Sequence, residues 1–552
     1  MKGFKAFNLS LPLGSMAAVL VFSIMVVACE SESDSDAHAD KNRIVVYTDD
    51  EEAFISRHIY GQFAEHLGTG IYGGIWVGED SDIPNTEGYR DDVLGALQRL
   101  EVPNVRWPGG CFADEYYWLD GVGPREDRPV RINTHWGMVA EDNSFGTHEF
   151  LRLMDLIDAE PVIAMNVGSG TPREMAQWIE YLNYDGESEM ADLRREHGRE
   201  EPWGVKYIGV GNESWGCGGN MSADYYADLF KRFATFTKDY SGHELYRVAS
   251  GFYDDEYDWT ETLVREAGEQ MQGISLHYYT IAGEGWDFKG PSADFDEALY
   301  YTGVSRALRM EEFIEGHVAR MDLHDPEEEI ALVVDEWGIW TDPIEGTNPG
   351  FLQQQNSLRD ALIASVTLDI FNHHAGRVRM ANIAQMINVL QAMILTDGPQ
   401  MLLTPTYHIF DMYRAHYDAQ LLRTDAEISS YSTELPETHE AGDLEAHHPH
   451  IESIPAISQS VSRSEDGHIN ITLTNLHAAE AQEIELLFEG GRIPGEVVEA
   501  DLLTADRPDA VNTFEQPDRV TLTSFDAFSY TQEQGQLSLE IPPHAVVKLR
   551  LQ

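Results

Sequence analysis

The feature that most restricts the fold of this chain is an alternation of short apolar runs and longer helix-like stretches between residues 54 and 413. The run "PVIAMNVGSG" is followed by "TPREMAQWIEYL", and "VKYIGVGNE" is followed by "ADYYADLFKRFATFTKD". Strands that are apolar on both faces and alternate with helices are typical of a parallel sheet. A stretch of this length predicts an eightfold βα barrel that carries insertions. A doubly wound sheet is the alternative, although no GxGxxG phosphate loop opens any of the units.

Beyond residue 413 the pattern changes to alternation of apolar and polar residues. The segments "ISQSVSRSEDGHINITLTNL", "QEIELLFEG" and "LSLEIPPHAVVKLRLQ" alternate with period two and are separated by turn residues. This pattern predicts an antiparallel, jelly-roll-like β-sandwich over residues 414–552. The early segment "RIVVYT" has the same character, so we expect a strand over residues 44–52 to join the sandwich.

The first residues have the pattern of a targeting segment. Lys2 and Lys5 precede the apolar run "MAAVLVFSIMVVA", which is too short to span a bilayer comfortably. The following "VVAC" resembles a bacterial lipobox, so residues 1–29 are expected to be a lipoprotein signal with Cys29 as the lipid-modified residue. Residues 30–43 are polar and acidic, which predicts a flexible tether. We therefore expect an exported bacterial lipoprotein, anchored to a membrane and facing the periplasm or the cell surface; an ordinary cleaved signal or a short anchor is the alternative.

The chain is strongly acidic, with 95 Asp and Glu against 37 Lys and Arg and a formal net charge of −58. Such a surface repels nucleic acid and anionic lipid, and it suits a neutral partner such as a sugar. It also resembles the surfaces of proteins from high-salt environments; stability that rose as salt fell below physiological levels would refute this hypothesis. The three cysteines show no spacing typical of a metal site, and the sequence alone does not decide whether Cys111 and Cys217 form a disulfide.

Two glutamates stand at the ends of predicted strands, Glu213 in "GVGNES" and Glu336 in "VVDEWG". A βα unit takes roughly 30 to 40 residues, so about three units separate them and their carboxylates are expected to face each other across the barrel mouth. Hydrolysis of a glycosidic bond requires such a pair, one to protonate the leaving oxygen and one to attack the anomeric carbon. The alternative is that both glutamates are only hydrogen-bonded polar groups at strand ends.

The neighbours of these glutamates favour the catalytic interpretation. Asn212, beside Glu213, supplies an amide that can bind a sugar hydroxyl next to the reacting carbon. Trp215 and Trp337 offer flat apolar faces that suit a sugar ring, although either tryptophan could simply belong to the core.

Longer strings in the chain are similar to glycoside hydrolase family 51, the α-L-arabinofuranosidases of the retaining clan A. The strings that carry this resemblance are "IYGQFAEHLGTGIYGGIWV", "VRWPGGCFADEYYWLDGVGP", "NTHWGMVAEDNSFGTHEF", "REEPWGVKYIGVGNESWGCGGNM", "ISLHYYT" and "ANIAQMINVLQAM". They occur in the order of the family, and the resemblance runs from about Ile44 to the C-terminus. The barrel of residues 54–413 would then be the catalytic domain.

The resemblance implies a role for each matching residue. Glu213 corresponds to the acid/base and Glu336 to the nucleophile. The positions that would contact or support the substrate are Glu65, Arg106, Cys111, Asn212, His277, Tyr279 and Gln385. Among these, Tyr279 is ambiguous because Tyr278 is its neighbour, and asparagine is a common variant at the position of Cys111.

The implied activity is that of a retaining, exo-acting α-L-arabinofuranosidase. It would hydrolyse terminal non-reducing α-L-arabinofuranosyl residues of plant polysaccharides and oligosaccharides by double displacement, without a metal or organic cofactor. The expected partners are an arabinose-containing saccharide and, through the lipid anchor only, a membrane; the family also allows a homo-oligomer. The alternatives are another clan A glycosidase, such as a β-xylosidase or an endoglucanase, and a non-catalytic glycan-binding or structural surface lipoprotein. A panel of aryl glycosides separates these alternatives.

Overall fold

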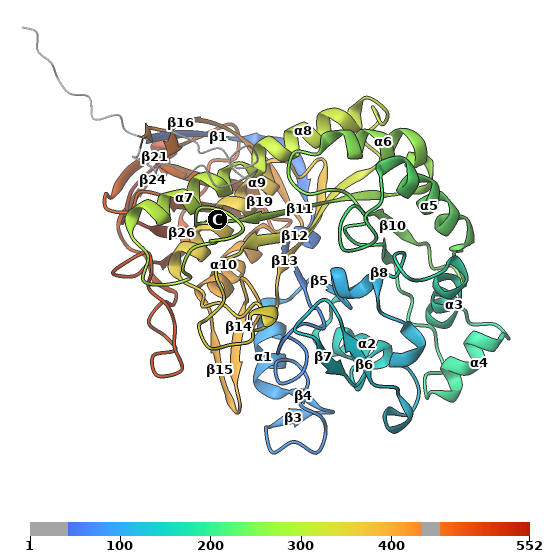
Figure 1. Ribbon diagram of the computed structural model, residues 1–552. Helices are drawn as coiled ribbons and strands as arrows, with labels where there is room; N and C mark the ends of the chain where they lie inside the picture. The colour runs from blue at the N-terminus through green and yellow to red at the C-terminus, as the bar shows by residue number, and fades with distance from the viewer. Residues whose placement is uncertain (1–41, 433–452) are drawn as a thin grey trace, which may run out of the picture. The chain divides into compact units, whose positions relative to one another are not determined.

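A closed barrel of eight parallel strands forms the centre of the part of the chain that the computed structural model describes, residues 42–432 and 453–552 (Figure 1). The strands follow one another around the barrel in chain order, which confirms the predicted eightfold βα barrel and excludes the doubly wound alternative. The barrel strands are β2 (Gly61–Phe63), β5 (Asn104–Trp107), β8 (Glu160–Met165), β9 (Tyr207–Val210), β10 (Tyr246–Ala249), β11 (Gly273–Thr280), β12 (Ala331–Ile339) and β13 (Val378–Ala384).

Helices connect the barrel strands and lie outside them, with α3 to α6 side by side along the right of the view (Figure 1). The helices are α1 (Asp91–Leu100), α2 (Thr147–Ile157), α3 (Pro172–Asn183), α4 (Glu189–Glu196), α5 (Ala223–Phe236), α6 (Tyr257–Ala267), α7 (Glu297–Leu308), α8 (Met310–Asp322), α9 (Leu358–His373) and α10 (Pro405–Tyr413).

The start of α3 illustrates how the local sequence fixes these helices. The Thr171 hydroxyl accepts the backbone N–H of Glu174, and the Glu174 carboxylate accepts the backbone N–H of Thr171. Pro172 occupies the first helical position, where its missing N–H costs no hydrogen bond. The helix therefore begins directly after the loop that leaves β8, and the loop is kept short at the carboxyl end of the barrel.

The second region is a ten-stranded sheet, the β-rich domain expected after the barrel. The sheet runs in the order β23 (Thr523–Ser524), β22 (Val497–Leu503), β26 (Ala545–Leu551), β20 (Ile469–Asn475), β19 (Ile457–Arg463), β16 (Ala419–Glu427), β1 (Asn42–Ile55), β21 (Gln482–Glu489), β25 (Gln536–Ile541) and β24 (Phe528–Thr531).

Strand β1 joins the two ends of the described chain within this sheet. It pairs antiparallel with β16 on one side and parallel with β21 on the other, so one strand pair departs from the antiparallel pattern that alternation alone predicts. The polypeptide then passes directly from β1 into η1 (Arg57–Tyr60) and the first barrel strand. The barrel and the sheet belong to one compact unit, Lys41–Gln552.

Helix α9 lies between the barrel and the sheet. All of its residues from Leu358 to Asn372 are buried, and it packs against β12 of the barrel and against β19, β20 and β26 of the sheet. A helix that is buried on every face needs no exposed polar stripe, and the polar residues of α9, such as Arg359 and Asp369, are buried with the apolar ones. The sheet has its own apolar core, to which Ile44 and Val46 of β1 contribute.

Four two-stranded antiparallel sheets lie outside the barrel and the ten-stranded sheet. They are β3 (Asn85–Thr86) with β4 (Tyr89–Arg90), β6 (Arg131–Asn133) with β7 (Val139–Glu141), β14 (Ile394–Asp397) with β15 (Gln400–Leu403), and β17 (Ser430–Tyr431) with β18 (Ile454–Pro455).

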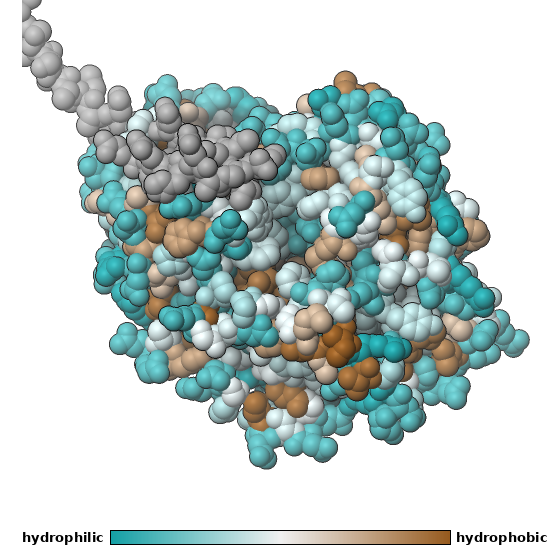
Figure 2. Space-filling view, viewed as in Figure 1, coloured by the Kyte–Doolittle hydropathy of each residue, from teal (hydrophilic) through white to brown (hydrophobic). Residues whose placement is uncertain are grey.

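The face of the molecule seen in Figure 2 is mainly hydrophilic. Hydrophilic side chains cover most of the face in Figure 2, and hydrophobic ones occur there in small separate patches. Over the described residues, none of the helices combines the length and the apolar character needed to cross a membrane. The predicted signal, Cys29 and almost all of the predicted tether lie outside the described residues.

Candidate active site

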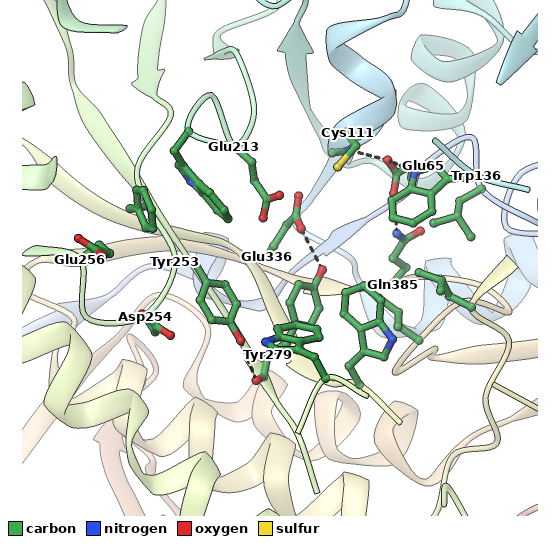
Figure 3. A pocket seen from close by; sticks show the side chains of 18 residues that line it. Glu65, Cys111, Trp136, Glu213, Tyr253, Asp254, Glu256, Tyr279, Glu336 and Gln385 are labelled. Atoms are coloured by element: carbon green, nitrogen blue, oxygen red, sulfur yellow. Dashed lines mark hydrogen bonds between the residues drawn. The ribbon is translucent and has the colours of Figure 1, made fainter. Parts of the chain in front are cut away.

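A cavity of about 470 Å³ opens at the carboxyl ends of the barrel strands and contains three glutamates, Glu65, Glu213 and Glu336 (Figure 3). Because loops at this end of a βα barrel are free to vary while the strands hold them, it is the usual place for chemistry in such folds. The wall of the cavity is largely aromatic and is formed by Trp136, Trp215, Phe252, Tyr253, Tyr279, Trp286 and Trp340.

A β-bulge in β12 brings two neighbouring carboxylates to the barrel mouth. Ser275 of β11 pairs with Val333, and the next pair is His277 with Glu336, so over this stretch β12 holds one residue more than β11. Adjacent residues in a regular strand face opposite sides, and an extra residue breaks this alternation. Both Asp335 and Glu336 thus contact the same groups, Arg106 and His277.

The Glu336 carboxylate is held by donors at both oxygens. Arg106, on β5, donates from Nη1 to Oε1 at 2.8 Å, and the hydroxyl of Tyr279, on β11, donates to Oε2 at 2.9 Å. Burial and the charge of Glu336 raise the pKa of Tyr279 well above its usual value, so the phenol keeps its proton and donates. The hydroxyl of Tyr278 instead donates to the carbonyl of Arg306, which resolves the choice between the two tyrosines in favour of Tyr279.

Glu213 is presented by a tight loop directly after β9. Its backbone has φ of +39°, an uncommon conformation for a residue other than glycine, and its carbonyl accepts the N–H groups of Gly216 and Gly218. These contacts turn the side chain into the cavity, where Figure 3 shows its carboxylate facing that of Glu336. An oxygen of Glu213 and an oxygen of Glu336 lie within 4.8 Å of each other.

His277 lies among three carboxylates. Its Nδ1 is 2.9 Å from Oε1 of Glu213 and 3.6 Å from Oε2 of Glu336, and its Nε2 is 3.0 Å from Oδ1 of Asp335. Burial alone would lower the pKa of His277, but the carboxylates of Glu336, Asp335 and Glu213 outweigh it and raise the pKa to about 10. The ring is therefore an imidazolium that donates from both nitrogens.

Glu65, which follows β2, accepts the backbone N–H groups of Gly110 and Phe112 and the indole N–H of Trp136 at Oε1. Its other oxygen accepts the amide of Gln385 at 3.1 Å, so these two residues line the same wall of the cavity. Burial, together with the charge of Glu336, raises the pKa of Glu65 to about 7.

Asn212 is fixed from two sides. Its side-chain oxygen accepts Nη2 of Arg106 at 2.6 Å, and its backbone N–H donates to Asp114 at 2.9 Å. The same Asp114 carboxylate accepts the N–H groups of Val167 and Gly168, so it holds the loop after β8 against the loop after β9. Neither aspartate was among the predicted site residues, although Asp114 lies in the string "VRWPGGCFADEYYWLDGVGP" and Asp335 directly precedes Glu336 in "VVDEWG".

Cys111 forms a disulfide with Cys217, whose Cα atom is 5.5 Å away. The bond ties the loop after β5 to the loop that carries Glu213, and Cys111 lines the cavity. The Sγ atom of Cys217 is 3.4 Å from Oε2 of Glu213.

The two tryptophans that the sequence singled out have different positions. Trp215 lines the cavity and stacks on Phe252, with ring centroids 4.3 Å apart. Trp337 is 1% exposed and packs against Phe371 and Phe410, so it belongs to the core and contacts no ligand. The expectation that Trp337 could stack on a sugar is therefore wrong.

The structure thus brings together nine predicted site residues that are far apart in the sequence. Glu65, Cys111, Glu213, Tyr279, Glu336 and Gln385 line the cavity, and Arg106, Asn212 and His277 hold them from behind. Two carboxylates within 4.8 Å of each other, one of them clamped by charged and hydroxyl donors, can act as an acid and a nucleophile on an acetal carbon.

Comparisons with known proteins agree with this geometry. Two family models match the chain, one described as "Alpha-L-arabinofuranosidase 1 domain" over residues 96–287 and one as "Alpha-L-arabinofuranosidase C-terminal domain" over residues 335–545. A protein of Bacteroides ovatus named "Intracellular exo-alpha-L-arabinofuranosidase" is 46% identical over 92% of this chain and 95% of its own length.

Solved structures give the same result. The GH51 arabinofuranosidase from Xanthomonas axonopodis pv. citri is 50% identical, with a TM-score of 0.88 over 93% of this chain and 100% of the other. The α-L-arabinofuranosidase from Thermotoga maritima, solved as an arabinose complex, is 31% identical, with a TM-score of 0.79 over 92% of this chain and 99% of the other.

One expectation is contradicted by these comparisons. The Bacteroides ovatus relative is named an intracellular enzyme, which overturns the prediction of an exported, membrane-anchored lipoprotein with a signal peptide. That prediction rested on two lysines, a short apolar run and one cysteine. Such a pattern depends on composition and length alone and involves no contact that only an exported chain would need.

Proposed function

This chain belongs to the α-L-arabinofuranosidases of glycoside hydrolase family 51, and from that premise we propose a retaining double displacement with Glu336 as nucleophile and Glu213 as acid/base. The observation that carries the proposal is the distance between the two carboxylates, which approach within 4.8 Å. Retaining glycosidases place the two carboxyl groups about 5 Å apart, whereas inverting enzymes separate them by roughly 6.5–9.5 Å to leave room for a water molecule.

In the first step Glu336 attacks the anomeric carbon of a terminal arabinofuranosyl group. Arg106 and Tyr279 each donate to one oxygen of Glu336 and so fix the direction in which the carboxylate presents its lone pair. Glu213 donates its proton to the departing oxygen as the glycosidic bond breaks.

The position of that proton follows from the contacts of Glu213. The imidazolium of His277 donates to Oε1, so the acidic proton is assigned to Oε2. The Cys217 sulfur, next to Oε2, belongs to a disulfide and has no hydrogen to donate. Oε2 can therefore carry the acidic proton without competition from a donor on Cys217. His277 is in this proposal a positioning residue, with Asp335 fixing its other nitrogen.

In the second step Glu213, now ionised, takes a proton from water, and the water oxygen displaces Glu336 from the anomeric carbon. The product leaves with the configuration that the substrate had. Asn212 is placed to bind the hydroxyl adjacent to the reacting carbon, and Glu65, Gln385 and Cys111 to contact the rest of the ring.

We propose terminal, non-reducing α-L-arabinofuranosyl groups of plant oligosaccharides and polysaccharides as the substrates. The exo-acting name of the Bacteroides ovatus relative and the arabinose complex of the Thermotoga maritima enzyme support this choice. Assembly of this chain with copies of itself stays a prediction.

The test follows hydrolysis of an aryl α-L-arabinofuranoside by proton NMR. The α-anomer of arabinose should form first and then mutarotate. If the β-anomer appeared first, the double displacement and the nucleophile role of Glu336 would both be refuted.

A further inference from the structure

Three atoms suited to a soft metal ion converge beside the proposed acid/base. The sulfurs of Cys111 and Cys217 and a carboxylate oxygen of Glu213 all lie within 4.8 Å of one another. In the described structure the two sulfurs are joined, and neither is a free thiolate. We propose that reduction of this disulfide creates a site for a thiophilic divalent cation such as Zn²⁺, and that the bound cation stops turnover by coordinating Glu213.

The ligand set fits this class of ion. Zn²⁺ binds thiolate sulfur at about 2.3 Å and carboxylate oxygen at about 2.0–2.2 Å, usually with four ligands, so two sulfurs, one oxygen and one water complete a tetrahedron. Two sulfurs of such a site are about 3.8 Å apart. Side chains on Cα atoms 5.5 Å apart can reach that separation by rotation about their Cα–Cβ bonds. Thiolates select soft ions over Mg²⁺ and Ca²⁺.

The surroundings leave the necessary atoms accessible. Cys111 and Glu213 line the cavity, so an ion can enter from solvent. Oε1 of Glu213 is occupied by His277, whereas Oε2 faces Cys217 at 3.4 Å and is the oxygen available to the metal. Figure 3 shows Cys111 and Glu213 on the same side of the cavity, above Glu336.

The redox step needs a thiol reductant, and a small dithiol balances it. One sulfur of the dithiol attacks the protein disulfide to form a mixed disulfide, and the second sulfur then displaces the remaining cysteine. The dithiol loses two electrons and two protons to become a cyclic disulfide, and each cysteine sulfur gains one electron and one proton. Binding of the cation then releases to solvent the two thiol protons and the proton on Oε2 of Glu213.

The consequence for activity depends on the proposed acid/base role of Glu213. A carboxylate oxygen bound to the cation can neither donate a proton to the leaving oxygen nor accept one from water. Disulfides persist in oxidising compartments and are mostly reduced in the cytosol. The cation would therefore inhibit the enzyme under reducing conditions and leave its turnover unchanged under oxidising conditions.

The experiment uses Co²⁺ as a visible probe on the full chain with Cys29→Ser, which leaves Cys111 and Cys217 as the remaining cysteines. The enzyme is treated with a dithiol, freed of it under anaerobic conditions and titrated with Co²⁺. We expect two free thiols and one equivalent of Co²⁺ with the near-ultraviolet absorption of a thiolate ligand. The oxidised enzyme should bind none, and Cys217→Ser should lose the absorption. Circular dichroism checks that each form is folded.

Activity is then measured on the same samples with Zn²⁺ in place of Co²⁺. The reduced enzyme should lose about 100-fold of its turnover relative to the reduced, metal-free enzyme, and a chelator should restore it. The oxidised enzyme should be indifferent to Zn²⁺.

Several results would overturn the inference. These are the absence of free thiols after dithiol treatment, the absence of the Co²⁺ absorption in the folded reduced enzyme, or full turnover by reduced enzyme saturated with Zn²⁺. The Co²⁺ titration contains no substrate, so its outcome does not depend on the acid/base assignment. Co²⁺ absorption together with full turnover in Zn²⁺ would refute the proposal that the bound cation stops turnover, whereas inversion in the NMR experiment would refute the proposed mechanism.

Discussion

The barrel mouth and the interface between α9 and the sheet both bury acidic side chains, but they neutralise them differently. At the mouth, Glu336 and Asp335 are paired with the cations of Arg106 and His277. At the interface, Asp369 has no cationic partner among the described residues, and its hydrogen bonds come from hydroxyl groups. The donors to Asp369 are Tyr413, Ser458, Ser460 and Thr472.

The difference shows what each arrangement is suited for. Hydroxyl donors compensate a buried carboxylate only in part, so burial raises the pKa of Asp369 to about 6. Asp369 is buried, and its hydrogen bonds join α9 to α10 and to strands β19 and β20. The mouth instead keeps charged groups beside an open cavity of about 470 Å³, where a substrate can exchange protons and bonds with them. Four predictions test this contrast.

The largest effect is expected for Glu336→Gln, which keeps the shape of the side chain and removes the nucleophile. We expect kcat to fall by roughly 10⁴-fold or more. Initial rates on an aryl α-L-arabinofuranoside measure it, and Glu345→Gln, an exposed glutamate on the loop after β12, is the matched control. Near-normal rates in Glu336→Gln would refute the assignment of Glu336 as the nucleophile and of the barrel mouth as the catalytic site.

Glu213→Ala should affect the two steps unequally. A substrate with an activated aryl leaving group needs little protonation, so the first step should proceed and release a burst of phenol. Hydrolysis of the intermediate should then be slower by about 10²–10⁴-fold. Added azide, which needs no general base, should restore turnover and give an arabinosyl azide. The assignment fails if azide changes nothing while the burst persists.

Arg106→Lys tests whether the mouth requires the planar guanidinium or only a positive charge. Arg106 reaches Glu336, Asn212 and Asp335 at once, a fork that a single ammonium cannot reproduce. We expect kcat/KM to fall by about 100-fold. Arg152→Lys, an exposed pair with Glu87, is the control and should keep its rate. Equal rates in both variants would show that charge alone is sufficient.

Asp369→Asn should alter stability and leave turnover unchanged. Because the pKa of Asp369 is raised from 3.8 to about 6 on folding, the folded chain binds more protons than the unfolded chain between these values. This group therefore lowers stability as pH rises through that window, by up to about 3 kcal/mol. The Asn variant lacks this contribution.

Melting temperatures measured from pH 4 to pH 7 provide the check on Asp369. The variant should gain relative to the wild type as pH rises. Parallel curves of melting temperature against pH would show that burial does not raise the pKa of Asp369. A large loss of turnover in the variant would show that this interface also supports catalysis.

Much of the fold could be predicted because it depends on local patterns. The spacing of apolar runs predicted the eight-stranded barrel, and period-two alternation predicted the β-rich region after it. The separation of Glu213 and Glu336 by about three βα units follows from counting residues, and in the structure Glu213 follows the fourth barrel strand and Glu336 lies in the seventh. Trp337 could also have been excluded, since it follows Glu336 in a strand and adjacent residues face opposite sides.

Other parts of the site depend on contacts between distant segments. Asp335 should face away from the mouth if β12 were regular, and the bulge that redirects it is visible only in its register with β11. Asp114 accepts backbone N–H groups from two other loops. Any residue type except proline can supply such a group, so the sequence of those loops does not reveal the contact. The pairing of Cys111 with Cys217 likewise requires that two loops be near in space.

The position of β1 in the interior of the sheet, between β16 and β21, has a consequence for synthesis on the ribosome. This strand is made early, but its partners begin at Ala419 and Gln482. At 5–20 residues per second the wait for β16 is roughly 20 to 70 seconds, during which both edges of β1 lack their native neighbours. An unpaired strand of this kind invites pairing with other chains, so nascent-chain chaperones should matter more for this enzyme than for a barrel whose first strand closes locally.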